Sequence, residues 1–125
     1  MKNPVGWFEI YVDDMDRASE FYKSVFNVSF EPLADPTNEN FKMMMFPSCM
    51  DTYGASGALV EVGDVKAGGN STIVYFSCDD CAVEESRIEA AGGKVERSKM
   101  SIGEHGFIVL AFDTEGNMIG LHSMQ

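Results

Sequence analysis

One strand, one helix and three strands are expected in that order twice along this chain, and this repeat limits the possible folds more than any other feature. Residues 5–12 alternate between apolar and mixed side chains, which is the period of a strand with two unlike faces. Asp13 and Asp14 then offer a helix N-cap and Asn27 a left-handed C-cap, with apolar residues at helical spacing between them. The first copy ends with three expected strands, at Val28–Leu33, Phe41–Phe46 and Gly57–Val62, and a loop at Ala34–Asn40.

The second copy follows the most linker-like stretch of the chain, Gly63–Asn70. A strand at Thr72–Cys78 leads through an aspartate pair into a helix at Cys81–Ala91, which Gly92 and Gly93 end. The expected strands that complete it are Lys94–Lys99, Gly106–Asp113 and Asn117–Ser123, with a tight hairpin turn at Thr114–Asn117. We therefore predict one α+β domain, residues 1–125, with module one at about 5–63 and module two at about 70–124.

Composition and charge exclude several classes of function. The net charge is -11, which argues against nucleic acid and anionic lipid as partners, because those need clustered Lys and Arg. The longest apolar stretches, such as Phe107–Phe112, are too short to span a membrane. The first residues carry no apolar signal core, and three cysteines fit a reducing compartment better than a disulfide framework, so we expect a cytoplasmic protein.

Three stretches match the pattern of one known family, and together they span nearly the whole chain. Residues Trp7–Ala18, followed by Phe21 and Tyr22, are similar to its first strand and helix. The end of its second helix is matched by Ile88–Val95, and its final hairpin by Phe112–Leu121, which contains the sequence Gly-Asn before an apolar strand. In this order and spacing the sequence resembles the vicinal-oxygen-chelate superfamily of glyoxalases, bleomycin-resistance proteins and dioxygenases.

The resemblance implies two βαβββ modules whose curved mixed sheets surround a cavity, with helices on the outer face and commonly a homodimer. The implied functions range from lyase, isomerase and dioxygenase reactions to the sequestering of drugs, and the fold does not choose among them. In metal-dependent relatives, His, Gln or Glu ligands lie on the first and last strands of each module. Those positions here carry residues that do not bind metals, namely Trp7, Ala58, Ile73 and Gly120. We therefore expect no cofactor, and a shifted register leaves a divalent metal at Glu9, Glu61 and His122 as the alternative.

The strand faces turned away from the helices are the predicted lining of the cavity. The ligand-binding candidates on these faces are Trp7, Tyr11, Tyr75 and His122. Aromatic residues, methionines and a few polar groups are typical of a small-molecule pocket, although an ordinary packed core uses the same residues. Glu9 lies between two aromatic residues, where burial would disfavour its charged form and make it a candidate catalytic acid or base. At a strand edge open to water, Glu9 would only be solvated.

Two histidines and two cysteines carry further hypotheses. His105 lies in a glycine-flanked loop and is the second catalytic candidate, with an exposed loop histidine as the alternative. His122 either contacts a ligand or has a hydrogen-bonded structural role. Cys78 and Cys81 have the spacing of a redox pair, but the two aspartates between them disfavour a thiolate, so two buried side chains are the favoured interpretation.

Two functions therefore stay open. In the first, a glyoxalase-like enzyme acts on a small oxygenated metabolite in a dimer cavity, with Glu9 as acid or base. In the second, a metal-free protein of the bleomycin-resistance kind binds a small molecule or drug and changes no bond.

Overall fold

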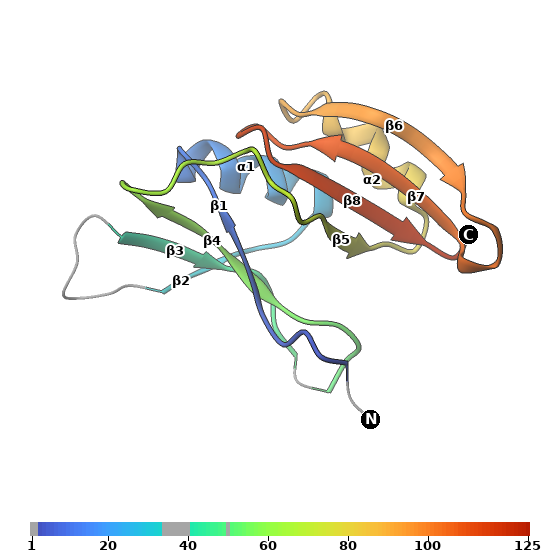
Figure 1. The fold of residues 1–125 in the computed structure, drawn as a ribbon, viewed down its shortest axis with the longest axis horizontal. Coiled ribbons are helices and arrows are strands. Elements are labelled where there is room, and N and C mark those ends of the chain that lie inside the picture. Colours follow the sequence, from blue (N-terminus) through green and yellow to red (C-terminus); the bar gives the residue numbers. More distant parts are fainter. Residues whose placement is uncertain (1–2, 34–40, 50) are drawn as a thin grey trace.

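The computed structural model describes residues 3–33, 41–49 and 51–125 (Figure 1). Its order of elements in module one is β1 (Phe8–Tyr11), α1 (Met15–Phe26), β2 (Glu31–Pro32), β3 (Phe41–Met45) and β4 (Gly57–Val62). Module two consists of β5 (Val74–Ser77), α2 (Cys81–Ile88), β6 (Lys94–Ser101), a short 3-10 turn (Gly103–His105), β7 (Phe107–Phe112) and β8 (Met118–Ser123). The predicted repeat of one strand, one helix and three strands is confirmed.

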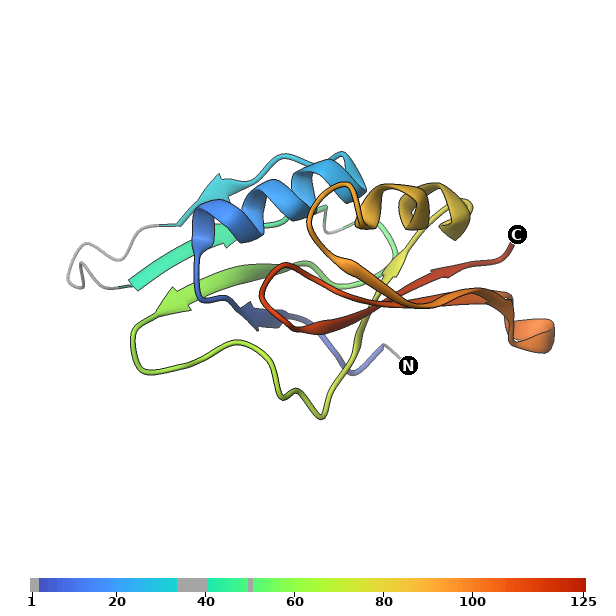
Figure 2. The ribbon, with the colours of Figure 1, turned by 90° about the horizontal axis from the view of Figure 1, so that it is seen from above.

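The eight strands of the described residues form two four-stranded mixed sheets with the same topology. The strand orders are β1-β4-β3-β2 and β5-β8-β7-β6, and in each sheet the first strand runs parallel to the last strand of its module. No strand pairing joins the two sheets in the part of the chain that the structure describes, so they do not close into a barrel. Both helices lie on the same side of the sheets (Figure 2). The α+β fold and the outer position of the helices agree with the prediction.

Several predicted boundaries were wrong. The strand expected at Val28–Leu33 is reduced to β2, because only Glu31 and Pro32 form ladder pairs with β3, to which Leu33 adds one backbone hydrogen bond, to Met43 at 2.9 Å. The second helix ends at Ile88 instead of Ala91, and β6 continues to Ser101, two residues beyond its predicted end. The loop expected at Ala34–Asn40 lies outside the described residues.

Local capping explains where the helices begin. The Asp14 side chain accepts a hydrogen bond from the backbone N–H of Arg17 at 3.1 Å, and Asp80 accepts one from Ala82 at 3.0 Å. At the other end of α1, Asn27 has a φ of 55°, the left-handed conformation that closes a helix. With 12 and 8 residues, neither described helix is long and apolar enough to cross a membrane.

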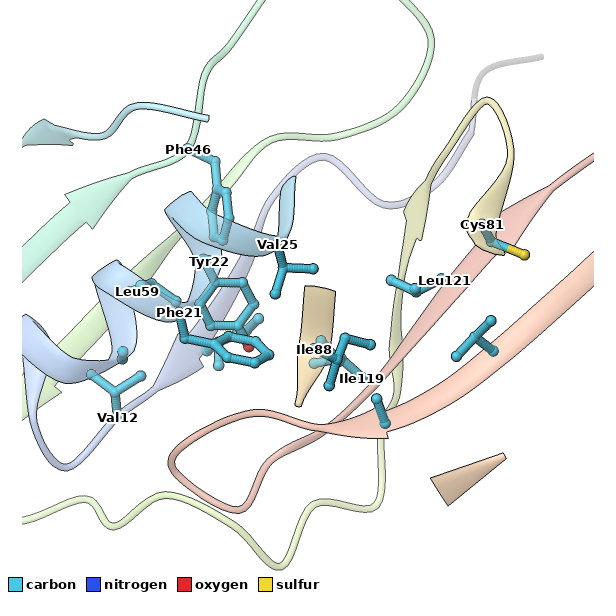
Figure 3. Close-up of a cluster of buried hydrophobic side chains, with 14 of the residues drawn as sticks. Val12, Phe21, Tyr22, Val25, Phe46, Leu59, Cys81, Ile88, Ile119 and Leu121 are labelled. Atoms are coloured by element: carbon cyan, nitrogen blue, oxygen red, sulfur yellow. The ribbon is translucent and has the colours of Figure 1, made fainter. Parts of the chain in front are cut away.

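One hydrophobic core joins the two modules beneath the helices (Figure 3). Tyr22 is fully buried at its centre, with its ring centroid 5.6 Å from that of Phe46 and 5.9 Å from that of Phe76. The rings of Phe26 from module one and Phe76 from module two lie 4.4 Å apart. Because aromatic rings contribute the largest buried areas, this cluster holds α1 against module two.

The turn between β7 and β8, residues 113–117, is a second connection between the modules, and we call it the terminal turn. The Asp113 carboxylate is buried and accepts the backbone N–H groups of Glu115 at 2.8 Å and Asn117 at 2.9 Å. It also accepts the hydroxyl of Tyr22 at 2.7 Å, which ties the turn to α1. Gly116 has a φ of 83°, a conformation that favours glycine. The turn is therefore held rigid by one carboxylate.

Glu115, in the same turn, binds the start of α1 with both carboxylate oxygens. Its Oε1 accepts the backbone N–H groups of Asp13 and Asp14, each at 2.9 Å. Its Oε2 accepts Nε of Arg17 at 2.7 Å and the hydroxyl of Thr114 at 2.8 Å. Burial of this side chain opposes ionisation, but these hydrogen bonds outweigh it and lower the pKa of Glu115 to about 2. The terminal turn thus fixes β1 and α1 relative to β7 and β8.

Candidate functional site

The face of β1 that bears Trp7, Glu9 and Tyr11 is turned away from the helices. The alternate residues, Ile10 and Val12, are buried in the core, whereas Glu9 is exposed. Trp7 and Tyr75 of module two keep 44% and 46% of their surface exposed. The predicted assignment of faces therefore agrees with the structure, because side chains alternate along a strand.

Glu9 is held by two neighbours on its own strand. Nε1 of Trp7 donates a hydrogen bond to its carboxylate at 3.3 Å, and the hydroxyl of Tyr11 donates another at 2.9 Å. The hydrogen bond to Glu9 raises the pKa of Tyr11, with burial and the negative charge of Glu9 acting in the same direction. The burial that we expected for Glu9 is not found in the single chain, so what distinguishes this carboxylate is its two ordered donors.

A hollow of about 280 Å³ lies beside this strand, between β1 and the β5–β8 edge of the second sheet. Glu9 and Tyr11 line it, together with β5, the start of β8 and the linker, which we define as residues 63–72. The linker passes on the side of the sheets opposite the helices (Figure 2). Its contributions to the lining are Val65, Lys66, Gly68, Asn70 and Thr72. Of the candidate residues predicted from sequence, Glu9 and Tyr11 meet in this hollow, while Trp7, Tyr75, His105 and His122 lie outside its lining.

Two asparagines that sequence reasoning did not select as site residues hold the linker in place. Asn117 of the terminal turn accepts the backbone N–H of Gly68 at 2.7 Å. Asn70 accepts the N–H of Met118 at 3.2 Å and donates to its carbonyl at 3.0 Å. Both asparagines line the hollow. Asn70 lies in a turn-like segment, and Asn117 belongs to the Gly-Asn sequence of the final hairpin. Neither signal reveals partners some 50 residues away.

The two histidines lie together but away from the hollow. Nε2 of His122 is 2.7 Å from the backbone carbonyl of His105, which can only accept, so this nitrogen carries the proton. The His105 side chain is 78% exposed, with the carboxylate of Glu104 3.9 Å away. His122 therefore orients the loop that follows β6, and His105 points into solvent.

The positions that the resemblance assigns to metal ligands do not fit a divalent metal in this chain. A Cβ atom at Gly120 would lie 2.3 Å from Cδ2 of Tyr75, so the tyrosine ring occupies the space that a glutamate side chain would need. Ala58 is fully buried and offers no ligand atom. The side chains at Trp7 and Ile73 have no atom that coordinates Mg²⁺, Mn²⁺ or Zn²⁺.

The alternative metal set is not brought together either. Glu61 of β4 pairs with Lys42 on β3. It alternates with the β4 residues that pair with Glu9 and Tyr11 of β1, so its side chain points to the opposite side of the sheet. Its Oε1 accepts the N–H of Met15 at 2.7 Å and so caps α1. Across the residues that the structure describes, no three His, Cys, Asp or Glu side chains are arranged to hold a metal ion.

The Cys78–Cys81 pair lies at the junction of β5 and α2. Cys81 is fully buried, and burial together with the neighbouring Glu84 carboxylate raises the pKa of Cys78 to about 12. A thiol with so high a pKa is almost wholly protonated at neutral pH and is a poor nucleophile. The geometry therefore favours the interpretation of two structural side chains.

Alkylation kinetics test this assignment. Cys49 is exposed, so we expect native protein at about pH 8 to take up one equivalent of iodoacetamide rapidly, and denatured protein to take up three. A Cys49→Ser variant should abolish the rapid phase, as followed by mass spectrometry. Rapid modification of Cys78 in the native protein would contradict the assignment.

Comparisons with known proteins agree with this architecture. Residues 5–121 match the family model of the glyoxalase/bleomycin resistance protein/dioxygenase superfamily. No curated protein matches the chain. Glyoxalase I from Zea mays has a similar structure at 17% identity and a TM-score of 0.76, over 97% of this chain and 46% of the maize chain. The chain thus spans about half the length of that enzyme.

Two shorter proteins are similar over most of both chains. The fosfomycin resistance protein FosX from Listeria monocytogenes has 18% identity and a TM-score of 0.69, over 98% of this chain and 94% of its own. A glyoxalase-related enzyme from Fulvimarina pelagi has 16% identity and a TM-score of 0.67, over 98% and 88%. At these identities the likeness concerns the fold alone, while the match of the family model covers nearly the whole chain. The chain therefore belongs to the glyoxalase/bleomycin resistance protein/dioxygenase superfamily.

Proposed function

We propose that this chain binds a small oxygenated metabolite in the hollow beside β1, and does so without the metal of its metal-dependent relatives. The observation that supports this most is the Glu9 carboxylate, oriented by Trp7 and Tyr11 at the edge of a largely apolar hollow. Each of its oxygens already accepts one hydrogen bond and keeps a lone pair for a ligand hydroxyl. Apolar walls, including Val65, Val74 and Met118, supply the buried contact that small ligands need.

A second copy of the chain belongs to this proposal. The exposed rings of Trp7 and Tyr75 lie on the sheet faces opposite the helices, and such aromatic residues are enriched in interfaces. We propose that a homodimer covers these faces and completes the ligand cavity. Sedimentation equilibrium should then give twice the mass of the chain, and a monomer at micromolar concentration would contradict the dimer.

A catalytic version of this site is the second candidate. The hydrogen bond between Tyr11 and Glu9 couples a phenol to a carboxylate, which is a pair able to pass a proton to or from a ligand. In that version Glu9 is the acid or base of a lyase or isomerase reaction on the bound metabolite. Turnover of a compound that binds, lost in a Glu9→Gln variant that still folds, would distinguish catalysis from binding alone.

Ligand-induced stabilisation tests the binding proposal. We would measure thermal unfolding with a panel of small hydroxy acids, oxo acids and diols, together with metal analysis of protein purified without chelators. For a compound that stabilises the protein, Glu9→Gln should weaken binding at least tenfold, because the amide replaces one acceptor oxygen with a donor. Glu96→Gln, at an exposed position on β6, is the control and should leave affinity unchanged. Binding unaffected by Glu9→Gln, or a stoichiometric metal lost with Glu9, would contradict the proposal.

A cytoplasmic location completes the proposal. Support comes from the three cysteines, which are all free, and from the exposure of Cys49, which a reducing compartment tolerates. Fractionation of cells that express the protein should recover it with cytosolic markers, and recovery among exported proteins would contradict this location.

A further inference from the structure

We propose that Asn117 is the positioning residue of the hollow, because its side-chain amide connects the linker to β1 and so sets the distance between two of the hollow's walls. Tyr11, Gly68 and Asn117 all belong to the lining. The effect on ligand binding rests on the proposed function, whereas the structural role of the amide stands without it.

Every hydrogen-bonding group of the Asn117 side chain is used. Its Nδ2 donates to the carbonyl of Tyr11 at 2.9 Å and to Oδ2 of Asp113 at 3.1 Å. Its Oδ1 accepts the N–H of Gly68 at 2.7 Å. The residue is buried, so the loss of a partner leaves a poorly hydrated polar group, which costs free energy. A single amide thus holds three segments: β1, the linker and the terminal turn.

Only one orientation of this amide satisfies its surroundings. The carbonyl of Tyr11 and the carboxylate of Asp113 are both acceptors, and the N–H of Gly68 is a donor. A rotation that exchanged Oδ1 and Nδ2 would place acceptor against acceptor and donor against donor. Asp113 is itself fixed by the Tyr22 hydroxyl at 2.7 Å, so the orientation is transmitted from the buried core to the linker.

Asn70 provides a matched comparison at the other end of the same linker. Its side chain donates to the carbonyls of Thr72 at 2.7 Å and Met118 at 3.0 Å, so it too makes several hydrogen bonds to backbone groups of the lining. It is exposed, however, and its hydrogen bonds in the described structure go to Thr72 and Met118, not to β1. Replacing Asn70 therefore loosens the linker locally without releasing Gly68 from the terminal turn.

An Asn117→Asp substitution should make the attachment of the linker depend on pH. The introduced carboxyl would face the carboxylate of Asp113 and the carbonyl of Tyr11, so its ionised form repels both, while its protonated form can still donate to one of them. The charged and titratable groups of the surrounding elements include Glu9 and Tyr11 on β1, together with Asp13, Arg17, Tyr22, Lys66, Asp113 and Glu115. A purely volume-filling role for residue 117 predicts no such dependence, because the two side chains have nearly the same size.

Amide hydrogen exchange at Gly68 is the test, with protection factors measured by NMR at about pH 4.5 and about pH 7.5. In the natural protein we expect no pH dependence of protection at Gly68. In Asn117→Asp, protection at Gly68 should fall at least tenfold from the lower to the higher pH, while the core amides of Val109 and Leu121 keep theirs. Asn70→Asp should leave Gly68 protected at both pH values.

A second variant covers the case in which Asn117→Asp fails to fold. Asn117→Ser keeps a hydroxyl but is too short to reach Gly68 and Tyr11 together, so protection at Gly68 should fall at least tenfold at both pH values. Unchanged protection at Gly68 in a folded Asn117 variant at about pH 7.5, or an equal loss in Asn70→Asp, would overturn the proposal. No ligand is needed for this measurement, so failure of the Glu9→Gln experiment leaves its result intact.

Discussion

A Glu115→Gln variant is expected to lose about 2–3 kcal/mol of unfolding free energy at neutral pH, because hydrogen bonds to a buried charged group contribute about 1.5–3 kcal/mol each. All the partners of this side chain are donors: the N–H groups of Asp13 and Asp14, the guanidinium of Arg17 and the hydroxyl of Thr114. Glutamine has one acceptor oxygen, so its amide NH₂ must face a donor on one side or the other. The Glu115 side chain has no exposed surface, whereas Arg17 is half exposed, which keeps the estimate below that of a fully buried pair.

The same side chain predicts how stability depends on pH. The pKa of Glu115 is about 2 in the folded protein, below its ordinary value of 4.5. A carboxyl whose pKa is depressed by folding stabilises the protein fully above its unfolded pKa, and this contribution is lost as the pH falls through the folded pKa. The stability difference between the natural protein and Glu115→Gln should therefore be constant above about pH 4.5 and shrink toward pH 2.

Urea unfolding at a series of pH values measures both effects. Glu20→Gln is the matched control, because Glu20 pairs with Lys23 at 3.4 Å on the exposed side of α1 and should cost less than about 0.5 kcal/mol. A loss below about 1 kcal/mol for Glu115→Gln at neutral pH would mean that the terminal turn does not hold the modules together as the geometry indicates.

A Gly93→Ala variant is the second large effect, with an expected loss of about 2 kcal/mol from overpacking. A Cβ atom at this position would lie 2.5 Å from the carbonyl oxygen of Phe112 and 2.5 Å from Cε1 of Phe21. One of these is backbone and the other is a buried ring, so neither moves without disturbing the core between the modules. Glycine is needed here for a close approach and not for a left-handed conformation.

The control for this variant is Gly63→Ala in the linker. Nothing lies within 4 Å of a Cβ atom at Gly63, and its φ is not positive, so the change should be neutral within about 0.5 kcal/mol. Thermal or urea unfolding of both variants measures the two losses of stability. Equal stability of the two would show that the contacts around Gly93 relax at little cost.

Much of the fold followed from short-range patterns in the sequence. The alternation in residues 5–12 predicted which side of β1 is buried, and the cap residues Asp14 and Asn27 predicted the bounds of α1. Prediction failed where the bounds of an element depend on pairing with another strand. The strand expected at Val28–Leu33 shortened to β2, because among the described residues the ladder with β3 begins only at Glu31. The ring of Phe30 lies 4.7 Å from that of Phe46.

For the candidate site too, local patterns were predicted correctly and long-range contacts were not. Period-two reasoning placed Trp7, Glu9 and Tyr11 on one face, and the structure brings Glu9 and Tyr11 to the hollow. The strand period could not reveal that Glu61 caps α1, since this cap depends on a contact between residues 46 positions apart. Nor could it reveal that the ring of Tyr75 covers Gly120, since this requires the pairing of β5 with β8.

The sequence by itself determined the repeated module and the sides of the strands, because these are properties of residue type and local spacing. Only the tertiary structure decided where a hollow lies and which groups surround it. Those groups meet through contacts such as Asn117 with Tyr11, 106 residues apart, and Asn117 with Gly68, 49 residues apart. Local periodicity carries no information about such partners, since they are set by how the two sheets and the linker pack together.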